Sequence, residues 1–425
     1  MEPEQSADQL ARALAGRPGH VCLEGPNFSG RSDALKCMAG MDGHENVGDR
    51  IYIGPDVHAS ISTFMPTVRE ELDFHCKRSP VRDVIHALAQ SLGLDACMEN
   101  NPFTRALSGG QEVILALLGK LALNPELLAC DTCLEQLSPE NKQMLYNVVT
   151  SGAAGLVSLV VADNRSDDHN DARKISVASL AGRPFRGVRL PLASVNADQM
   201  RPCSRKPLDI SLKEVSFRYP DSKSDALCNI SAYLEGGKVY ALQGNNGSGK
   251  STWAKLLSGM LRPSKGVIQT RPCTGQNGIC DPSVVAYHFQ DPDLQLFETS
   301  VRNEIETGAR ATRDNVAQDG WGKMNLDAFG LTSVAAVHPF DLPFVVRKRL
   351  AIAATIAQGS AWIILDEPTL GQDEPTCKQL ATIIRRLAEF GHGVIIISHA
   401  IGFLDSVADN HLCLTKGELR PIPPN

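Results

Sequence analysis

Short apolar runs rich in β-branched residues alternate along this chain with longer stretches of helical character. The runs at 155–162 and 393–397 are far shorter than the roughly 20 apolar residues that cross a bilayer. Runs of this length are typical of strands buried on both faces of a sheet. We therefore predict an α/β fold in which helices cover mainly parallel sheets.

The same succession of motifs occurs twice. The glycine-containing loop 25–32 corresponds to 244–251, and the apolar run 127–131 corresponds to 362–366. Arg31 and Lys250 lie 219 residues apart, whereas we align Ile53 with Gln290 at 237 residues. The first copy is therefore shorter between its glycine loop and the next strand. An internal repeat of this kind indicates two related domains.

The length of the chain and a proline-rich segment indicate two domains and the boundary between them. A chain of 425 residues exceeds what one hydrophobic core usually supports. Residues 183–207 contain four prolines among polar residues, which is typical of a linker. We predict a truncated first domain at 1–182 and a full second domain at 208–425.

Composition narrows the function classes. The net charge of −6, with no long basic run, makes nucleic acid a poor electrostatic partner. The acidic first residues lack the features of a secretion signal, so we expect a cytoplasmic protein and read its 12 cysteines as unpaired. Cys130 and Cys133 form a CxxC, but no second pair at zinc-site spacing accompanies them, and we interpret them as small apolar residues.

The second copy carries a complete phosphate-binding loop. It follows the predicted strand 239–243 and opens a predicted helix at 252–261, which is the context that such a loop requires. Backbone N–H groups and the helix N-terminus would bind phosphate, Lys250 would reach the β- and γ-phosphates, and Ser251 would contact Mg²⁺. The expected ATP-binding residues of this loop are Gly244, Asn245, Asn246, Gly247, Ser248, Gly249, Lys250, Ser251 and Thr252.

Two later strands deliver catalytic candidates. Asp366 and Glu367 follow the apolar run 362–365, which suits Asp366 as a metal ligand and Glu367 as the group that orients and polarises water. His399 ends another apolar strand, and in this company we expect it to contact the γ-phosphate. A lone histidine in that position would more often be structural.

These motifs resemble the ATP-binding-cassette (ABC) ATPase family, so we predict two P-loop domains of the ABC type in tandem. The resemblance implies that Tyr219 stacks on adenine and that Gln290 is a third catalytic residue, which contacts Mg²⁺ and senses the γ-phosphate. It also implies that each ATP lies between the loop of one domain and the LSGGQ signature of the other. The signature stands intact in the first copy as Leu107 followed by Ser108, Gly109, Gly110 and Gln111.

Each copy lacks what the other keeps. Residues 342–346 of the second copy have lost the signature, with proline and bulky side chains in place of serine and glycine. In the first copy we place Arg31 at the loop lysine, Thr132 at the glutamate, Asp163 at the histidine and Ile53 at the glutamine. We therefore expect one catalytic composite site and one degenerate site, with the halves closing head to tail, although pairing of two chains stays open.

The segment 289–297, followed by Ser300–Ile305, is similar to ATPases of energy-coupling-factor importers of vitamins or metal ions. That similarity implies integral membrane transport subunits whose coupling helices dock after Ile53 and Gln290, with the chain peripheral on the inner face of the cell membrane. Residues 56–64 depart from the pattern. Another transport ATPase, a soluble non-transport ABC ATPase and a nucleotide-gated regulatory protein are the alternatives.

Overall fold

The computed structural model describes Leu14 and residues 19–24, 29, 31–41, 49–57, 60–62, 64–94, 104, 107, 109–151, 157–162, 173–176, 193–199, 207–220, 222, 224–271, 284–310 and 321–422. The chain divides into two compact units, Met1–Arg189 with Leu370–Asp373 and Leu190–Thr369 with Glu374–Asn425. Within the described ranges no helix is both long enough and apolar enough to cross a membrane.

The first unit is built on a five-stranded sheet with the order β2-β3-β4-β1-β5. All of its strand pairs are parallel. Its strands are β1 (Gly19–Glu24), β2 (Arg50–Ile53), β3 (Leu127–Asp131), β4 (Ser158–Ala162) and β5 (Arg173–Ser176).

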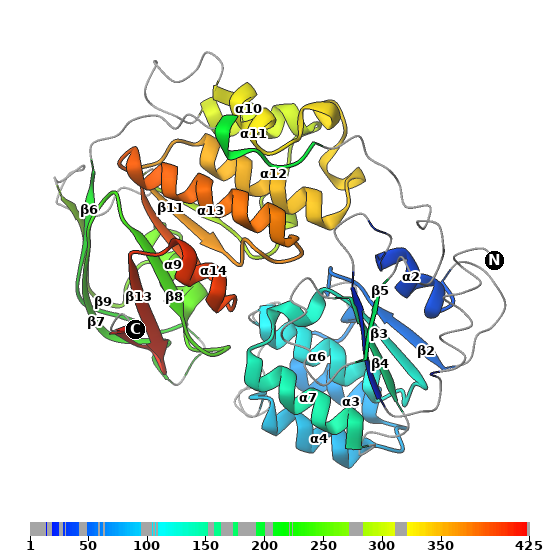
Figure 1. Cartoon of the computed structure of the whole chain (residues 1–425). Coiled ribbons are helices and arrows are strands. Elements are labelled where there is room, and N and C mark those ends of the chain that lie inside the picture. Colours follow the sequence, from blue (N-terminus) through cyan, green and yellow to red (C-terminus); the bar gives the residue numbers. More distant parts are fainter. Residues whose placement is uncertain are drawn as a thin grey trace. The chain divides into compact units, whose positions relative to one another are not determined.

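Helices cover both faces of this sheet (Figure 1). They are α2 (Arg31–Met38), α3 (Val68–Cys76), α4 (Arg82–Ser91), α6 (Gly109–Leu121) and α7 (Pro139–Ser151). Along β3, Leu128 and Cys130 pack with residues of α3, α4, α6 and α7, whereas Leu127 and Ala129 pack with residues of α2. Because strand side chains alternate between faces, one apolar strand supplies two cores.

The second unit contains a six-stranded sheet with the order β10-β11-β12-β8-β13-β14 and a three-stranded antiparallel sheet, β7-β6-β9. The order β10-β11-β12-β8-β13 matches that of the first unit strand for strand. These strands are β6 (Asp209–Phe217), β7 (Leu227–Leu234), β8 (Val239–Gln243), β9 (Lys265–Arg271), β10 (Val285–His288), β11 (Trp362–Asp366), β12 (Gly393–Ile397), β13 (Asn410–Thr415) and β14 (Glu418–Ile422).

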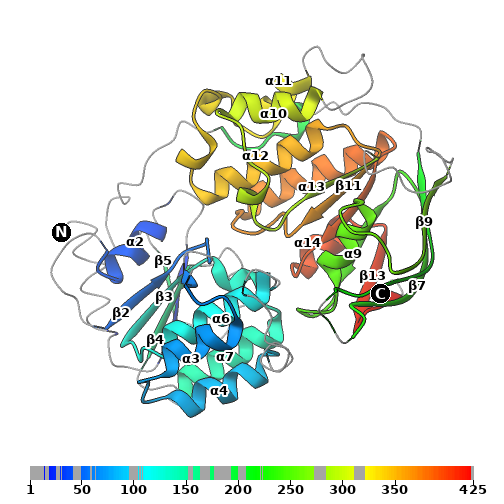
Figure 2. The ribbon, with the colours of Figure 1, turned by 180° about the vertical axis from the view of Figure 1, so that it is seen from behind.

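The larger sheet of this unit is also covered on both faces (Figure 2). Ile363 and Leu365 of β11 pack with α10–α13, and Trp362 and Ile364 pack with α9 and the antiparallel sheet. The helices are α9 (Lys250–Leu257), α10 (Val301–Arg310), α11 (Trp321–Ala328), α12 (Phe344–Ala357), α13 (Glu374–Glu389) and α14 (Ile401–Val407). The predicted α/β class with mainly parallel sheets is confirmed.

Two local expectations change in detail. The helix after the phosphate loop ends at Leu257, before the predicted Leu261, because Gly259 adopts φ 75°. Within the expected linker, residues 193–199 pack on the second unit: Val195 and Ala197 are buried in its core, and the N–H of Asn196 donates to the carbonyl of Ala328 at 2.7 Å.

Candidate active site

The phosphate loop of the second unit connects β8 to α9 and depends on its glycines. Gly244 and Gly249 adopt φ 149° and 105°, in the region that favours glycine. A Cβ on Gly244 would lie 2.3 Å from the carbonyl oxygen of Leu414, and one on Gly249 would lie 2.9 Å from that of Ala226. The loop therefore keeps this path only with glycine at both positions.

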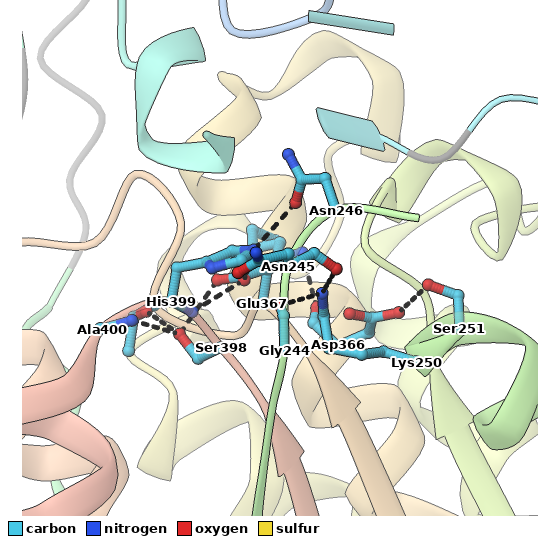
Figure 3. A network of polar contacts seen from close by, with 12 residues as sticks. Gly244, Asn245, Asn246, Lys250, Ser251, Asp366, Glu367, Ser398, His399 and Ala400 are labelled. Atoms are coloured by element: carbon cyan, nitrogen blue, oxygen red, sulfur yellow. Dashed lines mark hydrogen bonds and ion pairs between the residues drawn. The ribbon is translucent and has the colours of Figure 1, made fainter. Parts of the chain in front are cut away.

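Donors gather in this loop. Lys250 Nζ donates to the carbonyls of Gly244 (2.7 Å) and Asn245 (3.1 Å), and burial lowers the lysine pKa against the pull of Glu367 and Asp366 (Figure 3). Among the described residues, Asn246 Nδ2 and Ser248 Oγ are buried without a hydrogen-bond partner. Buried donors of this kind fit a phosphate group, which accepts several hydrogen bonds.

Asp366 ends β11 and receives two hydroxyl groups. Tyr287 donates to its Oδ2 at 2.8 Å and Ser251 Oγ donates to the same atom at 3.2 Å. Burial raises the pKa of this carboxyl group, and the Tyr287 hydrogen bond opposes that shift. Carboxylate, hydroxyl and amide oxygens are the donor set that Mg²⁺ prefers, so Asp366, Ser251 and Gln290 fit the expected metal.

Glu367 is held in a fixed orientation at the end of the same strand. It is buried, with φ 47°, and its N–H donates to the carbonyl of Ile397 at 2.8 Å. Its carboxylate accepts Ser398 Oγ (3.0 Å) and the N–H of His399 (3.0 Å). His399 Nε2 lies 3.9 Å from Glu367 Oε1 and 3.1 Å from Asn246 Oδ1, so two of the three predicted catalytic side chains meet the loop (Figure 3).

The remaining predicted residues of this unit lie near the same centre. Tyr219 is 39% exposed, and its hydroxyl lies 3.0 Å from Thr252 Oγ1 at the start of α9, which leaves the ring accessible for stacking. Gln290 follows β10 by two residues, and its carbonyl accepts a hydrogen bond from Lys348 Nζ.

The intact signature opens α6 of the first unit. Gly109 and Gly110 are its first two residues and Gln111 its third, so a helix N-terminus is present there, whereas Ser108 lies outside the described residues. The second unit has Pro343 before α12 and no side-chain cap.

The first unit keeps the backbone geometry of the site but changes its chemistry. Tyr52 donates to Asp131 Oδ2 at 2.9 Å, as Tyr287 does to Asp366, and both pairs are 79 residues apart. Thr132 shares the positive φ of Glu367, at 55°, and its N–H donates to the carbonyl of Ala162 as that of Glu367 does to Ile397. A threonine in this place has no carboxylate to offer.

Strand register corrects part of our alignment. Tyr52 pairs with Ala129 and Tyr287 with Ile364, so Ile53 corresponds to His288 and the glutamine position is Pro55. The same register makes Asn164, rather than Asp163, the match of His399, and both lie outside the described residues. The glutamine and the histidine are absent from the first copy under either alignment.

Similarity to known proteins shows the family of this chain. Residues 227–370 match the ABC transporter family. An ABC transporter ATP-binding protein of Pyrococcus abyssi is 34% identical over 221 residues, which cover 51% of this chain and 83% of that protein. The chain belongs to the ABC transporter ATP-binding protein family. Members of this family hydrolyse ATP, and the chain is the ATP-binding subunit of an ABC transporter.

Two further ABC relatives extend the comparison. An ABC transporter ATP-binding protein of Methanosarcina acetivorans is 26% identical over 96% of this chain and 81% of its own length. The energy-coupling factor transporter ATP-binding protein EcfA2 of Clostridium perfringens is 34% identical over 46% of this chain and 71% of its own length.

Sequence motifs missed Tyr287 and Ser398, although the repeated 79-residue spacing from tyrosine to aspartate was visible in both copies.

Proposed function

We propose that this ABC subunit hydrolyses ATP at one composite site and drives an energy-coupling-factor type importer. The second unit would supply the nucleotide loop and catalytic groups, and Ser108 to Gln111 of the first unit would supply the signature. The observation that carries the proposal is that the units are complementary. Lys250 and Glu367 match Arg31 and Thr132 in the first unit, while the intact signature matches Leu342–Val346 in the second.

The chain's own groups suit water attack on the γ-phosphate. Glu367 can orient a water molecule and accept its proton, because Ser398 and the N–H of His399 hold the carboxylate in one orientation. Lys250 and the loop donors bind phosphate oxygens. Bound Mg²⁺, held by Ser251, Gln290 and Asp366, would neutralise phosphate charge.

Exposed aromatic residues support a membrane partner for both units. Phe297 is 73% exposed before α10, and Phe64, at the matching position before α3, is 86% exposed. Buried glutamates fix both segments: Glu304 accepts the N–H of Phe297 at 3.0 Å, and Glu71 accepts that of Ser62 at 2.9 Å. Preformed exposed aromatic residues are typical of docking sites, and the Clostridium relative is named for energy-coupling-factor transport.

The hydrolysis proposal is tested with the purified full-length chain. We expect Mg²⁺-dependent ATPase activity that Glu367→Gln lowers by about 10²–10⁴-fold, because the positioned base is lost. Thr132→Ala, the matching change in the first unit, should leave turnover unchanged. Equal losses in both variants, or wild-type turnover in Glu367→Gln, would contradict a single catalytic site in the second unit.

The transport proposal is tested in native membranes. Glu367→Gln with ATP is used as bait in detergent extracts, because slowed hydrolysis should hold the ATP-bound state and its partners. Recovery of a multi-helix membrane subunit together with a small membrane protein that binds substrate is the expected result. Recovery of soluble partners alone would overturn the importer proposal and leave the ATPase proposal standing.

A further inference from the structure

Helix α12, at the position of the lost signature, carries two basic residues, Arg347 and Lys348, at the end of its first turn, and both contact its own unit. Arg347 and Lys348 reach back to the segment 289–293, which includes Gln290. The one-site proposal gives this helix start no role, since it no longer carries the groups that bind phosphate. Its contacts nevertheless converge on the ends of the two strands that deliver Gln290 and Asp366.

Lys348 is the central contact. Its side chain is fully buried (0% exposed), and its Nζ donates to the carbonyls of Phe289 (3.4 Å), Gln290 and Asp366 (3.4 Å). One ammonium group therefore joins the end of β10 to the end of β11. Burying a lysine is costly unless it is well paired, so packing alone does not explain a cation here.

Arg347 and Gln295 reinforce the same connection. Arg347 pairs with both carboxylate oxygens of Asp293, at 2.7 and 3.0 Å, and its Nη1 donates to the carbonyl of Leu342. Gln295 accepts the N–H of Phe289 and donates to the carbonyl of Ala351 in α12. A bidentate arginine–carboxylate pair fixes orientation as well as distance.

The first unit offers a natural comparison. Counted from the signature, Glu112 and Val113 stand at the positions of Arg347 and Lys348, and Val113 is buried. Neither side chain can donate a hydrogen bond to a carbonyl as lysine does. The basic pair therefore occurs in the unit whose active-site groups are complete, and it is missing where they are degenerate.

We propose that the start of α12 is a brace for the active site, and that Lys348 and Arg347 are positioning residues for Gln290 and Asp366. This inference rests on the proposed ATPase function of the second unit. Lys348 fixes the two strand ends directly, and Arg347 holds the following turn through Asp293. The helix that lost its signature thus serves the ATP site of its own unit.

The test compares Lys348→Met with Lys213→Met, an exposed lysine on β6, in the full-length chain. In Lys348→Met we expect kcat to fall by about tenfold to a hundredfold and the Mg²⁺ concentration for half-maximal activity to rise. The KM for ATP should change little, because Lys250 and the loop are untouched. The thermal unfolding temperature should fall, because three buried carbonyl oxygens lose their donor, so kcat is measured well below that temperature. Lys213→Met should match the wild type.

Two outcomes overturn the brace: wild-type kcat and Mg²⁺ dependence in Lys348→Met, or a kcat that falls only in step with stability. If that variant does not fold, Asp293→Asn breaks the brace at a residue that is 25% exposed, and it should lower kcat while KM for ATP holds. Wild-type kcat in Asp293→Asn then overturns it. Absence of Glu367-dependent turnover in the wild type is a different result, which refutes the ATPase proposal itself.

Discussion

At the scale of single residues, Tyr287 extends the set that controls the metal side of the site. Its hydroxyl shares Asp366 Oδ2 with Ser251, so it fixes the carboxylate that is expected to face Mg²⁺. Tyr287→Phe removes only this hydroxyl and keeps the packing of the ring. We expect the Mg²⁺ concentration for half-maximal ATPase activity to rise about tenfold, measured by titration at saturating ATP.

Tyr52→Phe is the matched control, because it removes the same bond to Asp131 in the first unit. It should leave the Mg²⁺ titration unchanged if only the second unit is catalytic. Equal shifts in the two variants would mean that both aspartates take part in turnover, and no shift in either would remove Tyr287 from the site.

Residues that act through contiguous motifs were predictable, and those that act across strands were not. Lys250, Ser251 and Glu367 stand in local patterns whose chemistry is read directly from their neighbours. Lys348 contacts Gln290 from 58 residues away and Tyr287 contacts Asp366 from 79, so sheet pairing and helix packing create those sites. A lysine next to a lost signature gave no sign of burial in the sequence.

At the scale of elements, Asp409 ties three of them together. Asp409 lies immediately before β13. Its carboxylate accepts hydrogen bonds from the N–H of Val239 at the start of β8 (2.8 Å) and from Nη1 of Arg385 in α13 (2.8 Å). Asp409→Asn weakens both bonds, so we expect the free energy of unfolding to fall by about 1–2 kcal/mol near neutral pH. Urea unfolding monitored by circular dichroism measures this difference.

The same variant has a defined pH dependence. Burial alone would raise the pKa of Asp409, but the N–H of Val239 and the guanidinium of Arg385 lower it below the usual 3.8. A carboxyl group whose pKa is lower in the folded than in the unfolded state stabilises the protein fully above its unfolded-state pKa. This contribution is lost as the pH falls through the folded-state pKa. The difference in free energy of unfolding between the wild type and Asp409→Asn should therefore decrease below about pH 4. A difference that stays constant with pH would contradict an ionic role for Asp409.

Strands were more predictable than helix ends. The predicted strand 239–243 coincides with β8, since an apolar run between turn residues has few alternatives. The signature helix starts at Gly109, inside the signature itself, where two glycines give little indication of a helix. Alignment by motif spacing also matched Ile53 with Gln290, whereas the register of the strands matches Pro55 with Gln290.

At the scale of the whole molecule, two units share one strand order and divide their chemistry. The tandem arrangement, the linker and closure of one unit on the other stay predictions from resemblance and from this division. Opposite motifs are degenerate in the two copies, so one pairing of loop and signature is complete and the other is not, and we read the complete pairing as the catalytic one. That reading requires the signature of the first unit to serve the nucleotide of the second.

Gly109→Asp and Phe344→Asp test this requirement with one charge at matched positions, the first residues of α6 and α12. An acidic residue in the first turn of a helix is favourable, so neither variant should lose much stability. Gly109→Asp would place a negative charge where the signature approaches the γ-phosphate, and we expect ATPase activity to fall by about a hundredfold or more. Phe344→Asp should retain most activity, because residues 342–346 no longer face a nucleotide under this scheme. The reverse pattern in a steady-state assay would assign catalysis to the other composite site, and equal losses would mean that both sites turn over.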